Sequence, residues 1–117
     1  MATCSCNASR AFYRFPAMAR LEERTNQEQL AYIGYELAEA HEAYKTWEAT
    51  YGIPGSVQRV CGTDAPARRW DYGMELMDVI HAAETALRME FSDDEARDLR
   101  TEVERKNRER GYYDATS

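Results

Sequence analysis

Glycine and proline are scarce in this chain: six glycines and three prolines among 117 residues. So few turn-forming residues do not suit the many short, tightly connected strands of an all-β fold. Disorder is also disfavoured, because 44% of the residues are hydrophobic and only 31% are charged. The length allows one hydrophobic core and leaves no room for a second. We therefore expect a single soluble domain that is mostly helical.

Long hydrophobic runs are also missing. No apolar segment approaches the roughly 18 to 20 residues that a membrane-spanning helix needs, and no continuous hydrophobic signal core stands near residue 1. We expect a cytoplasmic protein without membrane contact. Its three cysteines, Cys4, Cys6 and Cys61, do not suggest a disulfide framework. Cys4 and Cys6 lack a second pair of Cys or His residues that would complete a zinc site.

Basic residues are outnumbered, 15 against 21 acidic ones, which gives a net charge of −6. Stable binding of nucleic acid is not expected, since it requires clustered Lys and Arg to neutralise phosphates. The basic residues that are present gather mainly near the C-terminus. A free nucleotide held through a metal ion remains compatible with this balance.

The first long helix is predicted over residues 25–51. Thr25 and Glu28 have the spacing of a capping box at a helix start. Gly52 and Pro54 supply the stop. Between these signals, apolar residues recur at spacings of three and four, which predicts a stripe that faces the core. The stripe consists of Leu30, Ile33, Leu37, Ala40, Tyr44 and Trp47.

A loop is predicted over residues 52–64, followed by a second long helix that starts between residues 64 and 67 and runs to about Phe91. Ser92 and Glu95 form another capping box, which predicts a third, shorter helix that stops at Gly111. The predicted buried stripe of the second helix consists of Leu76, Val79, Ile80, Ala83 and Leu87.

These elements predict an all-α bundle. Two long antiparallel helices and a shorter C-terminal helix make up a domain over residues 25–117, and an N-terminal helical arm covers residues 1–24. The apolar area of the two stripes exceeds what one short third helix can bury. We therefore expect helices of a second copy to complete the bundle, in a homodimer or homotetramer.

Two pairs of carboxylates border these stripes. Glu36 and Glu39 lie three residues apart on the first long helix, and Glu75 and Asp78 do so on the second. Side chains at this spacing are neighbours on a helix surface, roughly 5–6 Å apart at Cβ. If the helices pair through their stripes, the four carboxylates converge, which costs repulsion and desolvation unless a cation lies between them. A hard divalent ion such as Mg²⁺ fits this set of oxygen ligands.

Three motifs in order, Glu36-x-x-Glu39, Glu75-x-x-Asp78-Val79 and Lys106-Asn107-x-x-Arg110-Gly111-Tyr112, resemble the MazG-like members of the all-α nucleoside triphosphate pyrophosphohydrolase superfamily. The resemblance covers roughly residues 27–113. The segment between the acidic pairs is longer than is usual in that family, and the first 24 residues have no counterpart in it.

The resemblance implies hydrolysis of a nucleoside or deoxynucleoside triphosphate to the monophosphate and pyrophosphate. It implies Mg²⁺, with Mn²⁺ as the other candidate ion, held by the four carboxylates. Either Glu36 or Glu39 would orient or deprotonate the attacking water. Lys106 and Arg110 would hold phosphate oxygens and contribute to catalysis. The substrate-binding residues would be Lys106, Asn107, Arg110 and Tyr113.

Other interpretations start from different residues. His81 follows Asp78 by three positions, a pattern found in di-iron bundles. Such a bundle needs a second pair of this kind, and His41, the other histidine, does not follow a carboxylate by three positions. Trp70, Tyr72 and Tyr113 are candidates for stacking on a base, with aromatic packing as the alternative. A helical module that binds a partner protein without catalysis is the main alternative function.

Overall fold

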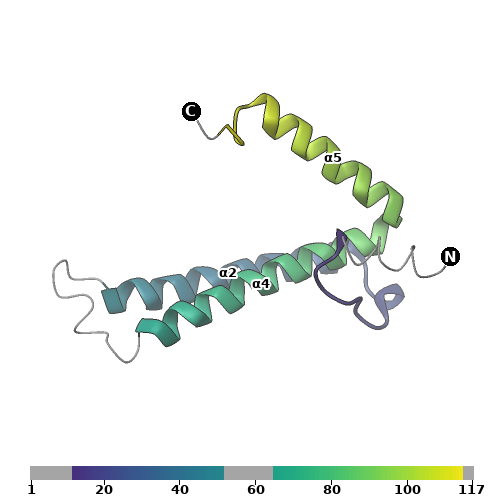
Figure 1. Ribbon diagram of the computed structural model, residues 1–117. Coiled ribbons are helices and arrows are strands. Elements are labelled where there is room, and N and C mark those ends of the chain that lie inside the picture. The colour runs from purple at the N-terminus through teal and green to yellow at the C-terminus, as the bar shows by residue number, and fades with distance from the viewer. Residues whose placement is uncertain (1–11, 52–64, 115–117) are drawn as a thin grey trace.

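The computed structural model describes residues 12–51 and 65–114 (Figure 1). In this part of the chain all regular structure is helical, which confirms the all-α prediction. The elements are η1 (Leu21–Glu23), α2 (Asn26–Tyr51), α4 (Ala65–Glu90) and α5 (Asp93–Glu109). The predicted 52–64 loop and all three cysteines lie outside the described residues.

Both predicted capping boxes are present. At the start of α2 the backbone N–H of Glu28 donates to Thr25 Oγ1 (3.0 Å), and Thr25 N–H donates to Glu28 Oε1 (2.9 Å). At the start of α5 the equivalent distances between Ser92 and Glu95 are 3.1 and 3.0 Å. A side-chain cap of this kind contributes about 1 kcal/mol. These local bonds explain why the helix starts were predictable.

The end of α5 is a Schellman motif. Tyr112 N–H donates to Asn107 O (3.0 Å) and Gly111 N–H to Arg108 O (3.0 Å). Gly111 has a φ of 78°, a left-handed conformation that costs glycine little because it has no Cβ. The predicted stop at Gly111 is thereby confirmed.

Helices α2 and α4 lie side by side and antiparallel, as a hairpin (Figure 1). The residues of α2 that are at least half-buried recur at spacings of three and four along the line that faces α4. They are Gln29, Ile33, Glu36, Ala40, Ala43, Trp47 and Thr50. Glu36 therefore lies inside the interface between the two long helices.

This line corrects the predicted stripe of α2. Leu30, Leu37 and Tyr44 were expected in the core but are 65%, 49% and 39% exposed. The two lines share every second residue, so periodicity fits both of them equally well. The face of α2 that packs on α4 is stabilised by Gln29, which is fully buried and donates from Nε2 to Ala82 O across the interface (2.9 Å).

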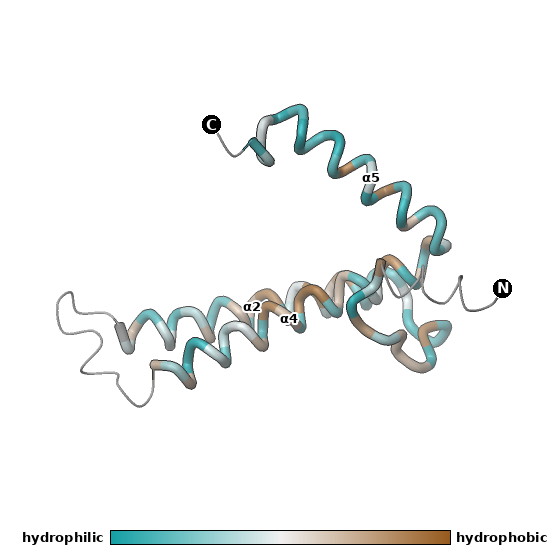
Figure 2. The backbone as a smooth tube through the Cα atoms, in the orientation of Figure 1, coloured by the Kyte–Doolittle hydropathy of each residue, from teal (hydrophilic) through white to brown (hydrophobic). Residues whose placement is uncertain are grey.

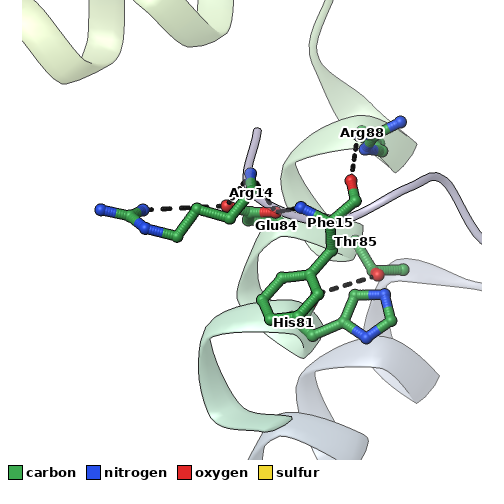
Figure 3. Close-up of polar contacts among 6 residues, drawn as sticks. All are labelled: Arg14, Phe15, His81, Glu84, Thr85 and Arg88. Carbon is green, nitrogen blue, oxygen red and sulfur yellow. Dashed lines mark hydrogen bonds and ion pairs between the residues drawn. The ribbon is translucent and has the colours of Figure 1, made fainter. Parts of the chain in front are cut away.

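The predicted stripe of α4 also needs correction. Leu76 is 39% exposed and Ala83 is exposed, whereas Val79, Ile80 and Leu87 are half-buried. The buried positions in the second half of the helix are Ala82, Glu84 and Thr85. Polar side chains reach these positions because residues 12–15 of the arm pack over this end of the helix (Figure 3).

Helix α5 diverges from the hairpin after its first turns (Figure 1). Most of α5 is hydrophilic, with a few hydrophobic segments along it (Figure 2). Leu99 and Val103, four residues apart on this helix, are 41% and 47% exposed. In the described part of the arm, Phe12 is helical, residues 13–20 contain no helix, and Leu21–Glu23 form the 3-10 helix η1. Pro16, which would interrupt a helix beyond its first turn, falls within residues 13–20. None of the described helices is long and apolar enough to cross a membrane.

Candidate metal centre

Three of the four predicted carboxylates meet at the middle of the hairpin. Glu36 on α2 and Glu75 and Asp78 on α4 each offer an oxygen, and these oxygens lie within 4.8 Å of one another. Glu36 is 8% exposed, Glu75 is half-buried and Asp78 is exposed. The group therefore extends from the helix interface to the surface.

Two oxygens of this group have no hydrogen-bond donor. Oε1 of Glu36 and Oε1 of Glu75 are buried and accept no hydrogen bond from any described residue. Leaving a buried polar atom unpaired costs about 1–3 kcal/mol, and more if it is charged. A divalent cation would satisfy both atoms and offset the repulsion, so the three residues fit Mg²⁺ or Mn²⁺.

The electrostatics of Glu75 reflect this crowding. Burial raises the pKa of Glu75 above its ordinary value of 4.5, and the carboxylates of Glu39, Asp78 and Glu36 raise it further. Glu39 therefore lies beside Glu75, although it is exposed and outside the group of three. The structure brings all four predicted ligands into one neighbourhood, with Glu39 at its edge.

Tyr32 was not among the predicted site residues. The pKa of the Tyr32 hydroxyl is raised above its ordinary value, mainly by interaction with Glu36 and to a smaller extent by burial. Tyr32 precedes Glu36 by four residues, so the two share a helix face. This spacing was a usable signal, but an exposed tyrosine on a helix is too common to stand out without the structure.

Cavities lie on both sides of the carboxylates. A small one of about 40 Å³ is lined by Glu36, Asp78 and His81, together with Tyr32 and Arg24. A groove of about 610 Å³ lies on the other side. The groove is lined by Ala38, Glu39, Glu42, Ala43, Thr46, Arg68, Trp70, Asp71, Met74 and Glu75.

The predicted basic tail does not join the carboxylates within one chain. Lys106 lies in the last turn of α5, Arg110 caps that helix, and this end of α5 points away from the hairpin (Figure 1). Asn107 Nδ2 donates to the Tyr113 hydroxyl at 3.4 Å. Tyr113 is 53% exposed. The four tail residues thus lie at the end of α5, apart from the carboxylates of the same chain.

His81 and the aromatic candidates also have clear positions. His81 stacks on Phe15 with ring centroids 4.6 Å apart and is not part of the group of three carboxylates, while His41 is exposed. Tyr72 packs on Trp47 at 5.7 Å, as the packing alternative expected. Trp70 is 69% exposed at the edge of the groove.

Comparison of the chain with protein-family models, with curated proteins and with solved structures finds no match.

Proposed function

We propose that this protein is a magnesium-dependent nucleoside triphosphate pyrophosphohydrolase, which releases the monophosphate and pyrophosphate. The observation that carries the proposal is the meeting of Glu36, Glu75 and Asp78 with two buried oxygens that lack donors. The order of acidic and basic motifs, which resembles the MazG-like enzymes, supports the same reaction.

A bound Mg²⁺ supplies Lewis-acid stabilisation of the phosphate charge. Glu36, Glu75 and Asp78 would hold it. Glu39 suits the role of the residue that orients water and accepts its proton, because it is exposed beside Glu75 on the wall of the groove, whereas Glu36 is enclosed. The structure thereby favours one of the two alternatives that the sequence left open.

The groove offers space for the nucleoside. Its volume of about 610 Å³ falls within the range of small-molecule sites, and Trp70 presents an exposed ring at its edge. An indole can stack on any nucleobase, because every base has a π face. Trp70 is therefore the aromatic residue best placed for substrate.

Lys106 and Arg110 would reach substrate from a second copy. Their helix leaves the hairpin of its own chain, and exposed Leu37, Leu76 and Leu99 mark apolar surface that another copy would cover. The active form would then be a homodimer or homotetramer in the cytoplasm.

The experiment is a panel of nucleoside and deoxynucleoside triphosphates with Mg²⁺ or Mn²⁺, followed by separation of the products. We expect monophosphate and pyrophosphate from at least one substrate. Asp78→Asn should lose this activity. Glu90→Gln on the same helix should retain it, because Glu90 is exposed and lies outside both the carboxylate group and the groove.

Release of diphosphate and orthophosphate, or no turnover across the panel, would contradict the proposal. The exposed apolar surface of the hairpin would then favour the helical interaction module instead. That surface includes Leu30, Leu37, Met74, Leu76 and Met77.

A further inference from the structure

A triphosphate needs cationic donors beside the metal ion, and within one chain the predicted Lys106 and Arg110 do not supply them. The small cavity that contains Glu36 and Asp78 is lined by a different cation, Arg24. Arg24 precedes α2 and belongs to the arm, for which the family resemblance offers no counterpart.

Arg24 is held in place from two sides. Its Nη1 donates to Oε1 of the fully buried Gln29, whose Nε2 donates in turn to Ala82 O at 2.9 Å. Its guanidinium carbon lies 5.7 Å from the centre of the Tyr32 ring, and Tyr32 lines the same cavity as Glu36. The guanidinium is therefore held by Gln29 on one side and by the Tyr32 ring on the other.

Most of the donors of Arg24 are unused. A guanidinium carries five N–H groups, and among the described residues Arg24 makes one hydrogen bond and no ion pair. Arg68, which lines the groove on the other side of the carboxylates, differs because it pairs with Asp71 at 3.5 Å. Arg24 thus has free capacity to bind an anion, and Arg68 has less.

Arg24 also faces a second, larger hollow at the surface. This hollow has a volume of about 680 Å³ and shares Met18, Arg24 and Tyr32 with the small cavity. Arg20 lies on its wall, together with the acidic Glu23 and Glu28. The carboxylate of Glu28 is engaged by Thr25 N–H.

We propose that Arg24 binds the phosphate chain of the substrate on the arm side of the metal centre, with Arg20 as a second cation in the same hollow. The proposal rests on the proposed function and adds a phosphate-binding site within the same chain. Arg24 would grip phosphate oxygens with the fork geometry that a lysine lacks.

The arm that carries Arg24 is anchored at its other end (Figure 3). Glu84 accepts the backbone N–H groups of Arg14 (2.9 Å) and Phe15 (3.1 Å), and Arg88 donates to Phe15 O (2.7 Å). These contacts fix residues 13–15 on α4, from which the chain continues to Met18, Arg20 and Arg24 at the cavity. Glu84 is accordingly a positioning residue for this phosphate site.

The test is the affinity of the Mg²⁺-loaded protein for inorganic triphosphate and for a nucleoside monophosphate, measured by calorimetry. Arg24→Gln should weaken triphosphate binding by about 10- to 100-fold and change monophosphate binding by less than about threefold, since each charge-assisted contact contributes about 1.5–3 kcal/mol. The triphosphate affinity of Arg24→Lys should fall between those of wild type and Arg24→Gln. Arg97→Gln is the matched control, because Arg97 pairs with Asp94 and lines none of these cavities, and it should stay within about twofold of wild type. Arg68→Gln tests the groove as the other place for the phosphates.

Melting curves with and without Mg²⁺ separate the possible failures. Absence of Mg²⁺ stabilisation in wild type would overturn the metal centre and the phosphate site together. If Mg²⁺ stabilises both wild type and Arg24→Gln, equal triphosphate affinities overturn the role of Arg24 alone. A loss of triphosphate affinity that is confined to Arg68→Gln would also overturn the role of Arg24, because it would place the phosphates in the groove. If Arg24→Gln melts early through loss of its bond to Gln29, Arg24→Lys decides, because it keeps the charge and loses the fork: wild-type triphosphate affinity in Arg24→Lys would overturn the proposal.

Discussion

Two enclosed carboxylates of the hairpin differ sharply in what surrounds them. Glu84 is 7% exposed and Glu36 is 8% exposed. Glu84 accepts backbone N–H groups from Arg14 (3.1 and 2.9 Å) and Phe15 (3.1 Å), with the Arg14 guanidinium 3.9 Å away. Glu36 lies instead among other carboxylates, and its Oε1 has no donor in the described residues. Equal burial therefore comes with opposite surroundings: Glu84 holds the arm on α4, whereas Glu36 Oε1 is left without a donor among the described residues.

The largest expected effect separates these two residues in turnover. Glu36→Gln should lower kcat on the order of 10²-fold or more, as expected when a group that stabilises developing charge is removed. Its melting temperature in chelator should stay the same or rise, because one member of a repelling group has been neutralised. The measurement is steady-state kinetics together with melting curves in chelator.

Glu84→Gln is the matched comparison for that experiment. Gln can still accept a hydrogen bond from Arg14 or Phe15, so it should lower kcat much less than Glu36→Gln while lowering the melting temperature. The opposite pattern, a stable but inactive Glu84→Gln beside an active Glu36→Gln, would remove the distinction between the two carboxylates.

The next effect concerns stability alone. Glu84→Ala should lower the free energy of unfolding by about 2 kcal/mol, because the N–H groups of Arg14 and Phe15 lose their acceptor in a partly buried place. Chemical denaturation would measure it. Glu48→Ala, an exposed position on α2, serves as the control and should stay within about 0.5 kcal/mol of wild type.

A smaller loss is expected from Arg88→Met. Its guanidinium lies 3.9 Å from the centre of the Tyr13 ring and donates to Phe15 O, and methionine keeps the packing but removes both interactions. We expect about 1–2 kcal/mol and faster proteolysis within residues 12–20. Proteolysis at the wild-type rate would mean that Arg88 does not hold the arm.

The smallest effect is a dependence on pH. The pKa of Glu75 is raised above 4.5 in the folded protein, so the folded state binds this proton more tightly than the unfolded chain. In chelator, stability should therefore fall as pH rises from 4.5 through the raised pKa, and the loss should be complete above it. The difference in melting temperature between wild type and Glu75→Gln should follow this course. A difference that does not change between pH 4 and pH 8 would contradict the crowding of the carboxylates.

The features of the fold that could be predicted from the sequence are those that local hydrogen bonds determine. Thr25, Ser92 and Gly111 set helix ends through contacts within a few residues, so their patterns were sufficient. The acidic pairs were also visible, because spacing along a helix fixes which side chains are neighbours. The face that α2 turns towards α4 was only half predicted: it depends on Gln29, a polar residue whose bond to Ala82 O lies across the interface.

The arm could not be predicted from the sequence for the same reason. Its position depends on backbone groups of Arg14 and Phe15 that bond to side chains about 70 residues further along the chain. Neither periodicity nor spacing reports such contacts. Arg24, which the arm brings to the carboxylates, was therefore missed, while Lys106 and Arg110 were found from their motif.

The most direct test of the metal centre is the melting temperature of wild type, Glu75→Gln and Glu48→Gln in chelator and across a titration of Mg²⁺. Ligand at 100 times its Kd stabilises a protein by about 2.7 kcal/mol, which is a shift of several degrees for a domain of this size. Wild type and Glu48→Gln should show this shift. Glu75→Gln should melt no lower than wild type in chelator and should lose most of the shift. A Glu75→Gln protein that is destabilised in chelator and still responds fully to Mg²⁺ would contradict a shared metal site at Glu36, Glu75 and Asp78.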